Sequence, residues 1–262
     1  MKKRHRGQTA EERLYYDSLY PQGDKVTKTP FQKWLVSLAP AMPNPKECTE
    51  KILKALGEIR GKQVCELGCG AGMLTYELAA RGAIISAIDI SAEAVKITQE
   101  KVSIFPKEQV KIQQMDACNL IFKDHSFDIV TGTFILHHID ILKAASEIKR
   151  VLKLGGHAVF SEPLAHNPIS NIWRTLTPNV RTRNEWPLSY SEILQISKFF
   201  SSVKYEEFDL LPLLSSLVYL VTFSQKAKIR SAEALSKLEP GLFRIFKPLK
   251  RFSGEILVEW TN

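Results

Sequence analysis

The stretch Glu66–Gly72 (ELGCGAG) holds three glycines within five residues, directly after a run, 62–67, that reads as a strand. A strand that turns sharply into a helix favours glycine because the turn needs backbone angles that other residues rarely adopt. Glycine also lets a ligand approach the backbone, and the first N–H groups of the helix then serve as hydrogen-bond donors. The stretch therefore predicts a ligand-binding turn between a strand and a helix.

The spacing of these glycines departs from both phosphate-binding signatures. A dinucleotide fingerprint needs glycines at relative positions 1, 3 and 6, whereas Gly68, Gly70 and Gly72 are followed by Met73 at position 6. The nucleoside-triphosphate motif is absent as well, because no lysine follows any of these glycines. The turn therefore suits a nucleotide-like ligand but matches neither phosphate signature.

Strand and helix patterns alternate along most of the chain. The pattern predicts strands over residues 62–67, 83–90, 110–114, 127–132, 157–161, 203–210 and 255–260, and helices over 45–59, 72–81, 91–103, 139–152 and 189–200. The central strands are apolar throughout, which is typical of a parallel sheet covered by helices on both faces. The class is therefore α/β, although the order of the strands cannot be read from the pattern.

The N-terminal segment has a different character. Residues 8–20 read as a short amphipathic helix with Leu14, Ser18 and Leu19 on one face, and five prolines then break the chain between residues 21 and 45. A basic start with no apolar stretch after it does not make a secretory signal.

Charge and composition limit the partners that the chain suits. The 262 residues fit one domain with an elaboration, and the net charge is +8. Residues 1–6 and 226–251 carry +10 between them, so the remainder sums to −2. A near-neutral body with basic ends disfavours a nucleic-acid partner. The four cysteines lack metal-site spacing, so we expect reduced thiols, no metal and a cytoplasmic protein.

Glu66–Gly72 resembles the first motif of the class I S-adenosylmethionine-dependent methyltransferases, and similar segments follow in the family's order. The resemblance implies that this stretch, Glu66 included, holds S-adenosylmethionine. It also implies that Asp89, with Ile90 beside it, binds both ribose hydroxyls, which suits a carboxylate because it accepts hydrogen bonds and donates none. Asp116 is expected to take the adenine amino group, with the Ala117 N–H nearby.

Two later segments extend the resemblance. Phe127–His138 (FDIVTGTFILHH) is similar to the family's fourth-strand motif, in which backbone near Gly132 faces the methionine part of the cofactor. Leu152–Pro163 (LKLGGHAVFSEP) is similar to the fifth-strand segment, in which a glycine turn precedes the strand. The family fold implied is a Rossmann-like, doubly wound sheet of seven strands, mostly parallel, with an antiparallel last strand that 255–260 (EILVEW) can supply.

The resemblance and the patterns together divide the chain into three parts. Residues 1–44 are expected to form an N-terminal helical lid segment, and 45–210 with 254–262 the Rossmann-like core. Residues 211–253 combine an apolar run with a basic helix and are expected to form a helical insertion before the last strand. This insertion fits a substrate cover, which we favour, or a segment lying on an anionic membrane surface. The apolar run 210–223 is too short to cross a bilayer alone.

The family's chemistry requires a nucleophile aligned behind the methyl carbon and, for some acceptors, a base. His137 and His138 follow the fourth strand, and Glu162 ends the fifth, so a histidine–carboxylate pair across the strand ends is expected. We hypothesise that one of these histidines, with His137 favoured, is the base. The alternative is that a histidine merely packs or holds the methionine carboxylate of the cofactor.

The acceptor side is rich in aromatic and basic residues. Expected substrate contacts come from residues 163–190 and from the N-terminal segment: Tyr16, Tyr20, Trp34, His166, Trp173, Arg174, Arg181 and Tyr190. The first hypothesis is O- or N-methylation of a small hydrophobic or aromatic molecule, secondary metabolites included. The alternatives are a lipid or quinone precursor methylated at the membrane surface, and a non-catalytic cofactor-binding regulator.

Overall fold

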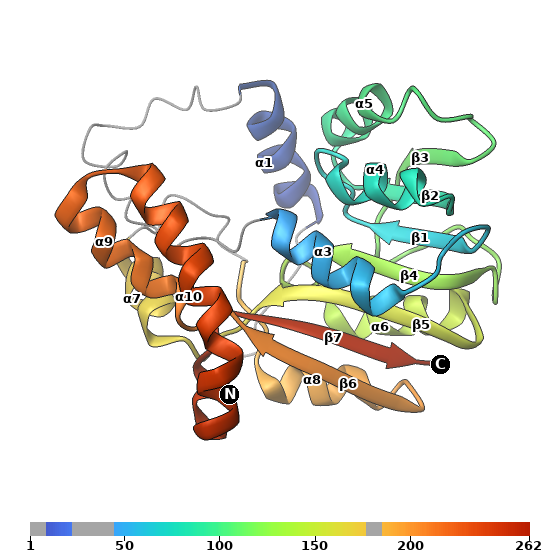
Figure 1. Cartoon of the computed structure of the whole chain (residues 1–262). Helices are drawn as coiled ribbons and strands as arrows, with labels where there is room; N and C mark the ends of the chain where they lie inside the picture. The colour runs from blue at the N-terminus through green and yellow to red at the C-terminus, as the bar shows by residue number, and fades with distance from the viewer. Residues whose placement is uncertain (1–8, 23–44, 177–184) are drawn as a thin grey trace.

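The computed structural model describes residues 9–22, 45–176 and 185–262. Seven strands form one sheet in the order β3-β2-β1-β4-β5-β7-β6 (Figure 1). The strands are β1 (Gln63–Leu67), β2 (Ile84–Asp89), β3 (Val110–Gln114), β4 (Phe127–Thr133), β5 (Leu152–Pro163), β6 (Ser202–Phe208) and β7 (Glu255–Thr261).

The strand directions confirm the predicted fold class. Strands β1 to β5 pair in parallel, whereas β7 runs antiparallel to both β5 and β6. The chain winds outward from β1 to β3 and then returns to place β4 on the other side of β1. In a doubly wound sheet, ligands bind beyond the carboxyl ends of the strands where the winding direction reverses. Here that point lies between β1 and β4.

Helices cover the sheet on both faces because their apolar residues recur at helical spacing. The helices α6 (Ile141–Val151) and α8 (Tyr190–Ser197) pack on one face, and α3 (Pro45–Leu56) and α4 (Met73–Ala80) on the other. The helix α5 (Ala92–Lys101) follows β2 and packs beside β3. Each layer buries a continuous apolar cluster, one around Trp260 and the other around Ile52.

Polar caps fix where several of these helices begin. Ser91 caps α5 by accepting a hydrogen bond from the Ala94 N–H, and Ser189 forms a capping box with Glu192 at the start of α8. Asp140 caps α6 in the same way through two backbone N–H groups. These residues place the loops before the helices, and therefore the strand ends, at fixed positions.

The fifth strand differs from the sequence-based expectation. It was predicted to begin at His157 after a glycine turn, but β5 begins at Leu152, which pairs with Phe127. The next pair joins Ile129 to His157, so residues 153–156 form a bulge rather than a turn before the strand. Gly155 has φ +73°, an angle that glycine adopts at little cost.

Four helices gather beyond the carboxyl ends of the parallel strands. The helix α1 (Thr9–Gln22) stands at the top of Figure 1, and α7 (Pro168–Leu176), α9 (Ser215–Thr222) and α10 (Gln225–Ile245) lie on its left. Short 3-10 helices accompany them, η2 (Leu136–His138), η4 (Pro212–Leu214) and η5 (Lys247–Phe252). Among the described helices, none combines the length and the apolar character needed to span a bilayer.

The predicted apolar face of the first helix is wrong at the one position that the structure describes. Leu14 is 70% exposed, whereas Glu12 is buried. The helix therefore turns a polar side of its surface toward the protein, and the reason lies in the site described below.

Candidate functional site

The three glycines after β1 adopt left-handed backbone angles, as a sharp turn requires. Their φ angles are +69° at Gly68, +52° at Gly70 and +72° at Gly72. A Cβ at Gly68 would lie 3.0 Å from the Ile135 side chain, and one at Gly72 would lie 3.0 Å from that of Thr98. At these two positions the left-handed backbone angle and the protein's own close packing both disfavour a side chain.

Gly132, near the end of β4, is constrained more tightly still. A Cβ there would lie 2.6 Å from the carbonyl oxygen of Leu67 and 2.9 Å from the Ile135 side chain. Glycine at this position therefore allows the Leu67 carbonyl of β1 and the Ile135 side chain to pack directly against the backbone of β4. Its expected place beside the methionine part of the cofactor stays a prediction.

Asp89 ends β2, and its carboxylate holds the glycine turn in place. Its Oδ2 accepts a hydrogen bond from the Gly70 N–H and its Oδ1 one from the Ser91 N–H, both at 2.9 Å. Each carboxylate oxygen has two lone-pair positions, so both retain capacity for a further donor such as a ribose hydroxyl. Burial raises the pKa of Asp89, and the backbone N–H groups partly offset that rise.

Glu66 is the penultimate residue of β1, near Asp89 at the end of the adjacent strand. Burial raises the pKa of Glu66 to about 8, the nearby charge of Asp89 adds to the rise, and Thr75 of α4 counteracts it. Glu66 is therefore largely protonated near neutral pH, so the paired strand ends carry less negative charge than two ionised carboxylates would.

The predicted adenine-binding pair follows β3. Asp116 is half-buried, and its Oδ1 accepts a hydrogen bond from the Cys118 N–H at 2.8 Å. Ala117 is buried between them, and Ile90 is half-buried after β2. The structure thus brings the predicted cofactor residues to the carboxyl edge of the sheet, with Asp89 and Asp116 following adjacent strands.

The predicted histidine–carboxylate pair forms between β4 and β5. The Nδ1 atom of His137 lies 2.7 Å from Oε2 of Glu162, and both side chains are buried. Glu162 also accepts hydrogen bonds from the N–H groups of Ile135 at 2.9 Å, Leu136 at 2.7 Å and His137 at 3.3 Å. Burial raises the pKa of Glu162 to about 7 against the effect of these donors. When ionised, Glu162 selects the His137 tautomer with its proton on Nδ1, which leaves the lone pair on Nε2.

His138 has its own partners, and they come from α1. Its Nε2 lies 3.0 Å from the Tyr16 hydroxyl, and its Nδ1 lies 3.6 Å from Oε2 of Glu12. The two imidazole rings are 4.0 Å apart between centroids. Two imidazole–carboxylate pairs therefore lie side by side. In the first, His137 pairs with Glu162 of β5, and in the second, His138 pairs with Glu12 of α1.

The helix α1 crosses the carboxyl edge from one strand end to another. Asp17 accepts a hydrogen bond from the Ser91 hydroxyl at 2.6 Å after β2, while Tyr16 reaches His138 after β4. Because β1 lies between β2 and β4 in the sheet, α1 passes over the glycine turn. This arrangement suits the predicted role of a lid, and it explains why Glu12 and Tyr16, four residues apart on one helical face, point inward.

Sequence reasoning missed Glu12 and Asp17. Both are charged residues in a helix whose predicted inner face was apolar, so no hydrophobic periodicity marks them. The available signal for Glu12 was its four-residue spacing from Tyr16, which places both on one helical face, and no such spacing marks Asp17.

The predicted acceptor residues divide into groups. Tyr16 lies at the site, as described above. Trp34 and Arg181 lie outside the described residues, and nothing is described of the Tyr20 side chain. Trp173 and Arg174 lie half-buried in α7, where the Arg174 Nη1 is 3.9 Å from Oε1 of Glu185.

His166 and Tyr190 lie apart from the histidine pair. Their ring centroids are 5.2 Å apart, and the Tyr190 hydroxyl donates a hydrogen bond to Glu207 of the edge strand β6 at 3.2 Å. Since β7 and β6 stand beyond β5 in the sheet, these rings belong to a neighbouring region of the surface. Their contact with an acceptor stays a prediction.

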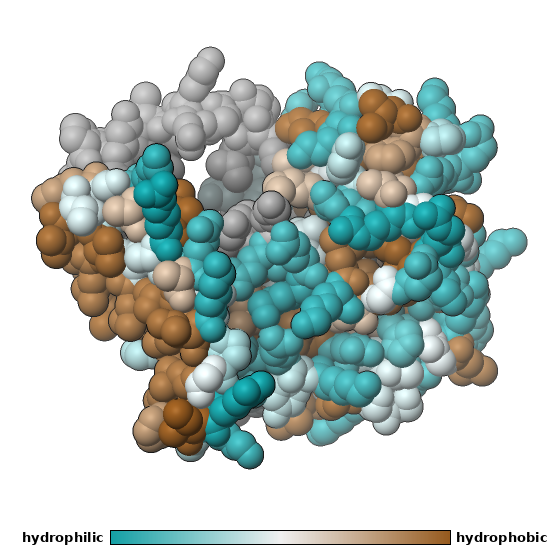
Figure 2. All heavy atoms as spheres, viewed as in Figure 1, coloured by the Kyte–Doolittle hydropathy of each residue, from teal (hydrophilic) through white to brown (hydrophobic). Residues whose placement is uncertain are grey.

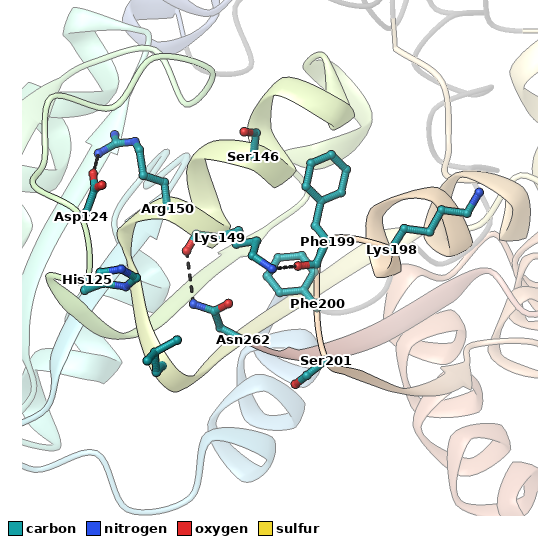
Figure 3. Close-up of a pocket in the computed structure, with 11 residues that line it drawn as sticks. Asp124, His125, Ser146, Lys149, Arg150, Lys198, Phe199, Phe200, Ser201 and Asn262 are labelled. Atoms are coloured by element: carbon teal, nitrogen blue, oxygen red, sulfur yellow. Dashed lines mark hydrogen bonds and ion pairs between the residues drawn. The ribbon is translucent and has the colours of Figure 1, made fainter.

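A hollow of about 550 Å³ lies at the opposite end of the sheet, where β4, β5 and β6 begin (Figure 3). Its polar side chains bond one another: Arg150 pairs with Asp124 at 2.8 Å, and Asn262 donates to the Lys149 carbonyl at 3.3 Å. It lacks the glycine turn and the buried histidines, so we place the functional site at the carboxyl edge. Within the described ranges, no three or more His, Cys, Asp or Glu side chains are arranged to hold a metal ion.

Comparisons with known proteins agree with this geometry. Residues 65–160 match a family model described as a methyltransferase domain. The ubiquinone biosynthesis O-methyltransferase of Alkalilimnicola ehrlichii is 32% identical over 127 residues, 48% of this chain and 51% of that protein. The chain thus spans about half the length of the curated relatives that it matches.

Two solved structures share the fold over nearly the whole chain. Phosphoethanolamine N-methyltransferase 2 of Haemonchus contortus, in complex with phosphomonomethylethanolamine and S-adenosylhomocysteine, has a TM-score of 0.61 at 20% identity and covers 97% of this chain and 58% of that one. The [4+2]-cyclase SpnF has a TM-score of 0.63 at 16% identity and covers 97% and 96%. At these identities the two structures bear on the fold alone.

The sheet order, the glycine turn, Asp89 at the end of β2 and Asp116 after β3 define a doubly wound α/β protein with these groups gathered at its switch point. The matched methyltransferase domain, residues 65–160, contains the glycine turn and both acids, and over this part the chain is similar to the class I S-adenosylmethionine-dependent methyltransferases.

Proposed function

We propose that the protein transfers a methyl group from S-adenosylmethionine to a hydroxyl oxygen of a small, hydrophobic aromatic molecule of the quinone-precursor type. The observation that carries the proposal is the buried His137–Glu162 pair, 2.7 Å apart, at the strand ends next to the glycine turn. The ubiquinone biosynthesis relative, which by its name methylates oxygen, supports the acceptor class.

The residues at the carboxyl edge fit the cofactor. The Asp89 carboxylate keeps acceptor capacity on both oxygens, and it is bonded to the left-handed glycine turn through the Gly70 N–H. Asp116 stands after the next strand, where an amino group can be accepted. When bound, S-adenosylmethionine supplies an electrophilic methyl group on a sulfonium.

The chain's own groups then align the acceptor and remove its proton. A hydroxyl oxygen becomes a stronger nucleophile as its proton moves to Nε2 of His137, and the Glu162 carboxylate stabilises the resulting imidazolium through Nδ1. The His138–Tyr16–Glu12 group fixes the second ring and keeps α1 across the edge, which excludes water from the site.

The test is a methyl-transfer assay with S-adenosylmethionine and a series of hydroxylated quinone precursors, comparing wild type with His137→Ala. Loss of a general base is expected to lower kcat by roughly 10²- to 10⁴-fold. The cofactor Kd should change little, because Asp89 and the glycine turn remain intact. His157→Ala is the matched control, since His157 also pairs with a glutamate, Glu259 at 3.4 Å, but is half-exposed and lies early in β5.

Unchanged turnover in His137→Ala would show that His137 is not the general base. Tight cofactor binding by the wild type without turnover on any hydroxyl, amine or carbon acceptor would instead favour the non-catalytic regulator. The two results are distinguishable because binding is measured separately from methyl transfer.

A further inference from the structure

The helix α9 turns a row of apolar side chains away from the protein. Leu217 is 59% exposed, Leu220 42% and Val221 82%, and the 3-10 helix before it adds Leu214 at 39%. Residues spaced by three, four and seven positions lie on one side of a helix. This side therefore forms a continuous apolar strip, although a helix on the surface of a soluble domain normally turns such a strip inward.

The strip continues at both ends. Phe223 caps the C-terminus of α9 with φ +51°, a left-handed angle that a bulky residue rarely adopts, and the residue is 70% exposed. On α10, Leu238 is 64% exposed and Ile245 75%, and Phe246 follows at 55%. Figure 2 shows the apolar atoms running from α9 down the side of α10. We call these eight residues, 214, 217, 220, 221, 223, 238, 245 and 246, the apolar surface.

A row of basic side chains borders the apolar surface. Lys226, Arg230, Lys237 and Arg244 are all exposed, and their spacing of four, seven and seven residues places them on one side of α10. Figure 2 shows hydrophilic atoms along α10 beside the apolar ones. Exposed Lys247 and Arg251 extend the charge beyond the helix.

Acidic residues are nearly absent from this side. Segment 226–251 has two, and one of them, Glu239, is buried against the loop before η4. Only Glu233 is exposed. The accessible face of α10 is therefore strongly positive.

We infer that the α9–α10 pair binds an anionic membrane surface, with the apolar surface inserted at the headgroup boundary and the basic row facing the lipid headgroups. The chemistry is that of an interfacial amphipathic segment, in which apolar burial and attraction to anionic lipids act together. A second protein of ordinary composition offers no comparable surplus of negative charge around an apolar centre.

The position of this surface agrees with the inference. In Figure 1, α7, α9 and α10 lie at the carboxyl edge of the sheet, the same end as the histidine pair. The helix α7 adds Ile172 at 63% and Leu176 at 60% exposure. A hydrophobic acceptor dissolved in a bilayer would thus meet the protein at the end that carries the site. Membrane binding itself needs no methyl transfer, so it stands or falls independently of the proposed function.

The experiment is sedimentation of the full chain with phosphatidylcholine vesicles, with and without phosphatidylglycerol, at low and high salt. Wild type should bind the anionic vesicles and be released by salt. Each lysine or arginine near an anionic surface contributes roughly fivefold in binding. Lys237→Gln with Arg244→Gln should therefore weaken binding by more than tenfold, and Leu217→Ser with Val221→Ser should weaken binding to the anionic vesicles at low salt as well.

Matched controls come from the other side of the molecule. Leu154 and Ile121 are 85% and 75% exposed but lie outside the α9–α10 pair, and Lys107 and Lys123 are exposed there as well. Their serine and glutamine variants should bind vesicles like wild type. Thermal unfolding of every variant separates lost binding from lost fold.

Two results would overturn the inference. One is a wild type that stays in the supernatant with anionic vesicles at low salt. The other is a dimer, seen by analytical ultracentrifugation, that Leu217→Ser with Val221→Ser converts to monomer while vesicle binding is absent, because the apolar surface would then contact a second copy.

Discussion

At the scale of single residues, Glu162 links the fold to the proposed chemistry. One buried carboxylate accepts three backbone N–H groups from the segment after β4 and orients His137 as well. The same bonds that hold the segment after β4 in place therefore set the tautomer of the imidazole. A substitution there should affect stability and turnover together.

Glu162→Gln tests this double role. Glutamine keeps the shape, but it has one acceptor oxygen in place of two, and its amide N–H groups face other donors. Leaving one or two buried N–H groups unsatisfied should cost about 2 to 4 kcal/mol of unfolding free energy. Turnover should fall at least as far as in His137→Ala. Urea unfolding and the methyl-transfer assay measure the two effects, and Glu259→Gln, in the half-exposed pair, should lose under about 1 kcal/mol.

A pH dependence of stability follows from Glu66. Its pKa is raised from 4.5 to about 8 in the folded protein. A raised pKa means that the folded state binds the proton more tightly than the unfolded state does. The stability that Glu66 contributes is therefore complete below its pKa in the unfolded state, and it is lost as the pH rises through its pKa in the folded state. Stability should therefore decline between roughly pH 4.5 and 8, by up to about 1.4 kcal/mol per pH unit.

Glu66→Gln removes that titration and should flatten the decline. Denaturant unfolding of both proteins at intervals across this pH range makes the comparison. A decline remains in the variant, because burial also raises the pKa of Glu162, Asp209 and Glu255. If the unfolding free energies of wild type and Glu66→Gln changed with pH in the same way, the raised pKa of Glu66 would be contradicted.

At the scale of elements, α1 and α10 are attached to the core by buried or half-buried carboxylates. Asp17 joins α1 to the cap of α5, and Glu239 of α10 accepts hydrogen bonds from the N–H groups of Asp209, Leu210 and Leu211 at 2.7 to 2.8 Å. The Glu239 attachment depends on one acceptor, whereas α1 is also held by Tyr16 and Glu12 at His138, so losing Asp17 should loosen α1 and not release it.

For α10, Glu239→Ala leaves three backbone N–H groups without their acceptor. Each unsatisfied group costs about 1 to 3 kcal/mol, reduced where water can enter, so we expect a total loss of about 3 kcal/mol. The exposed Glu233 of the same helix is the control, and Glu233→Ala should change stability by less than about 0.5 kcal/mol. Equal unfolding curves for the two variants would show that the attachment contributes nothing.

For α1, Asp17→Ala should loosen the helix without unfolding the core, because Ser91 still caps α5 through the Ala94 N–H. Amide hydrogen exchange should accelerate in residues 9–22 and stay unchanged in α5 and the sheet. Acceleration spread over the whole sheet would mean instead that α1 is part of the global folding unit.

At the scale of the whole molecule, the fold was largely predictable from the sequence. The contacts that α1 makes with the core were not. The seven-stranded sheet, the glycine turn and the His137–Glu162 pair follow from local patterns, since parallel strands bring their carboxyl ends to one edge. The role of Glu12 depends on how α1 docks across the chain, which no local pattern encodes. For the same reason Leu14 was wrongly expected to face inward.

The glycines at the site also show what a sequence pattern alone leaves open. The sequence indicated that a ligand required them, yet at Gly68, Gly72 and Gly132 the nearest obstacle to a side chain is the protein itself. Close packing between elements therefore favours glycine at these positions, whatever a ligand requires there.

The most direct measurement of the central claim is calorimetric titration of S-adenosylhomocysteine into wild type, Asp89→Asn and the distant control Asp124→Asn. Two hydrogen bonds to a carboxylate are worth about 3 kcal/mol together, so Asp89→Asn should weaken binding by roughly a hundredfold, and Asp124→Asn should match wild type. An absence of binding to wild type at millimolar cofactor, or equal affinity in all three proteins, would contradict the account.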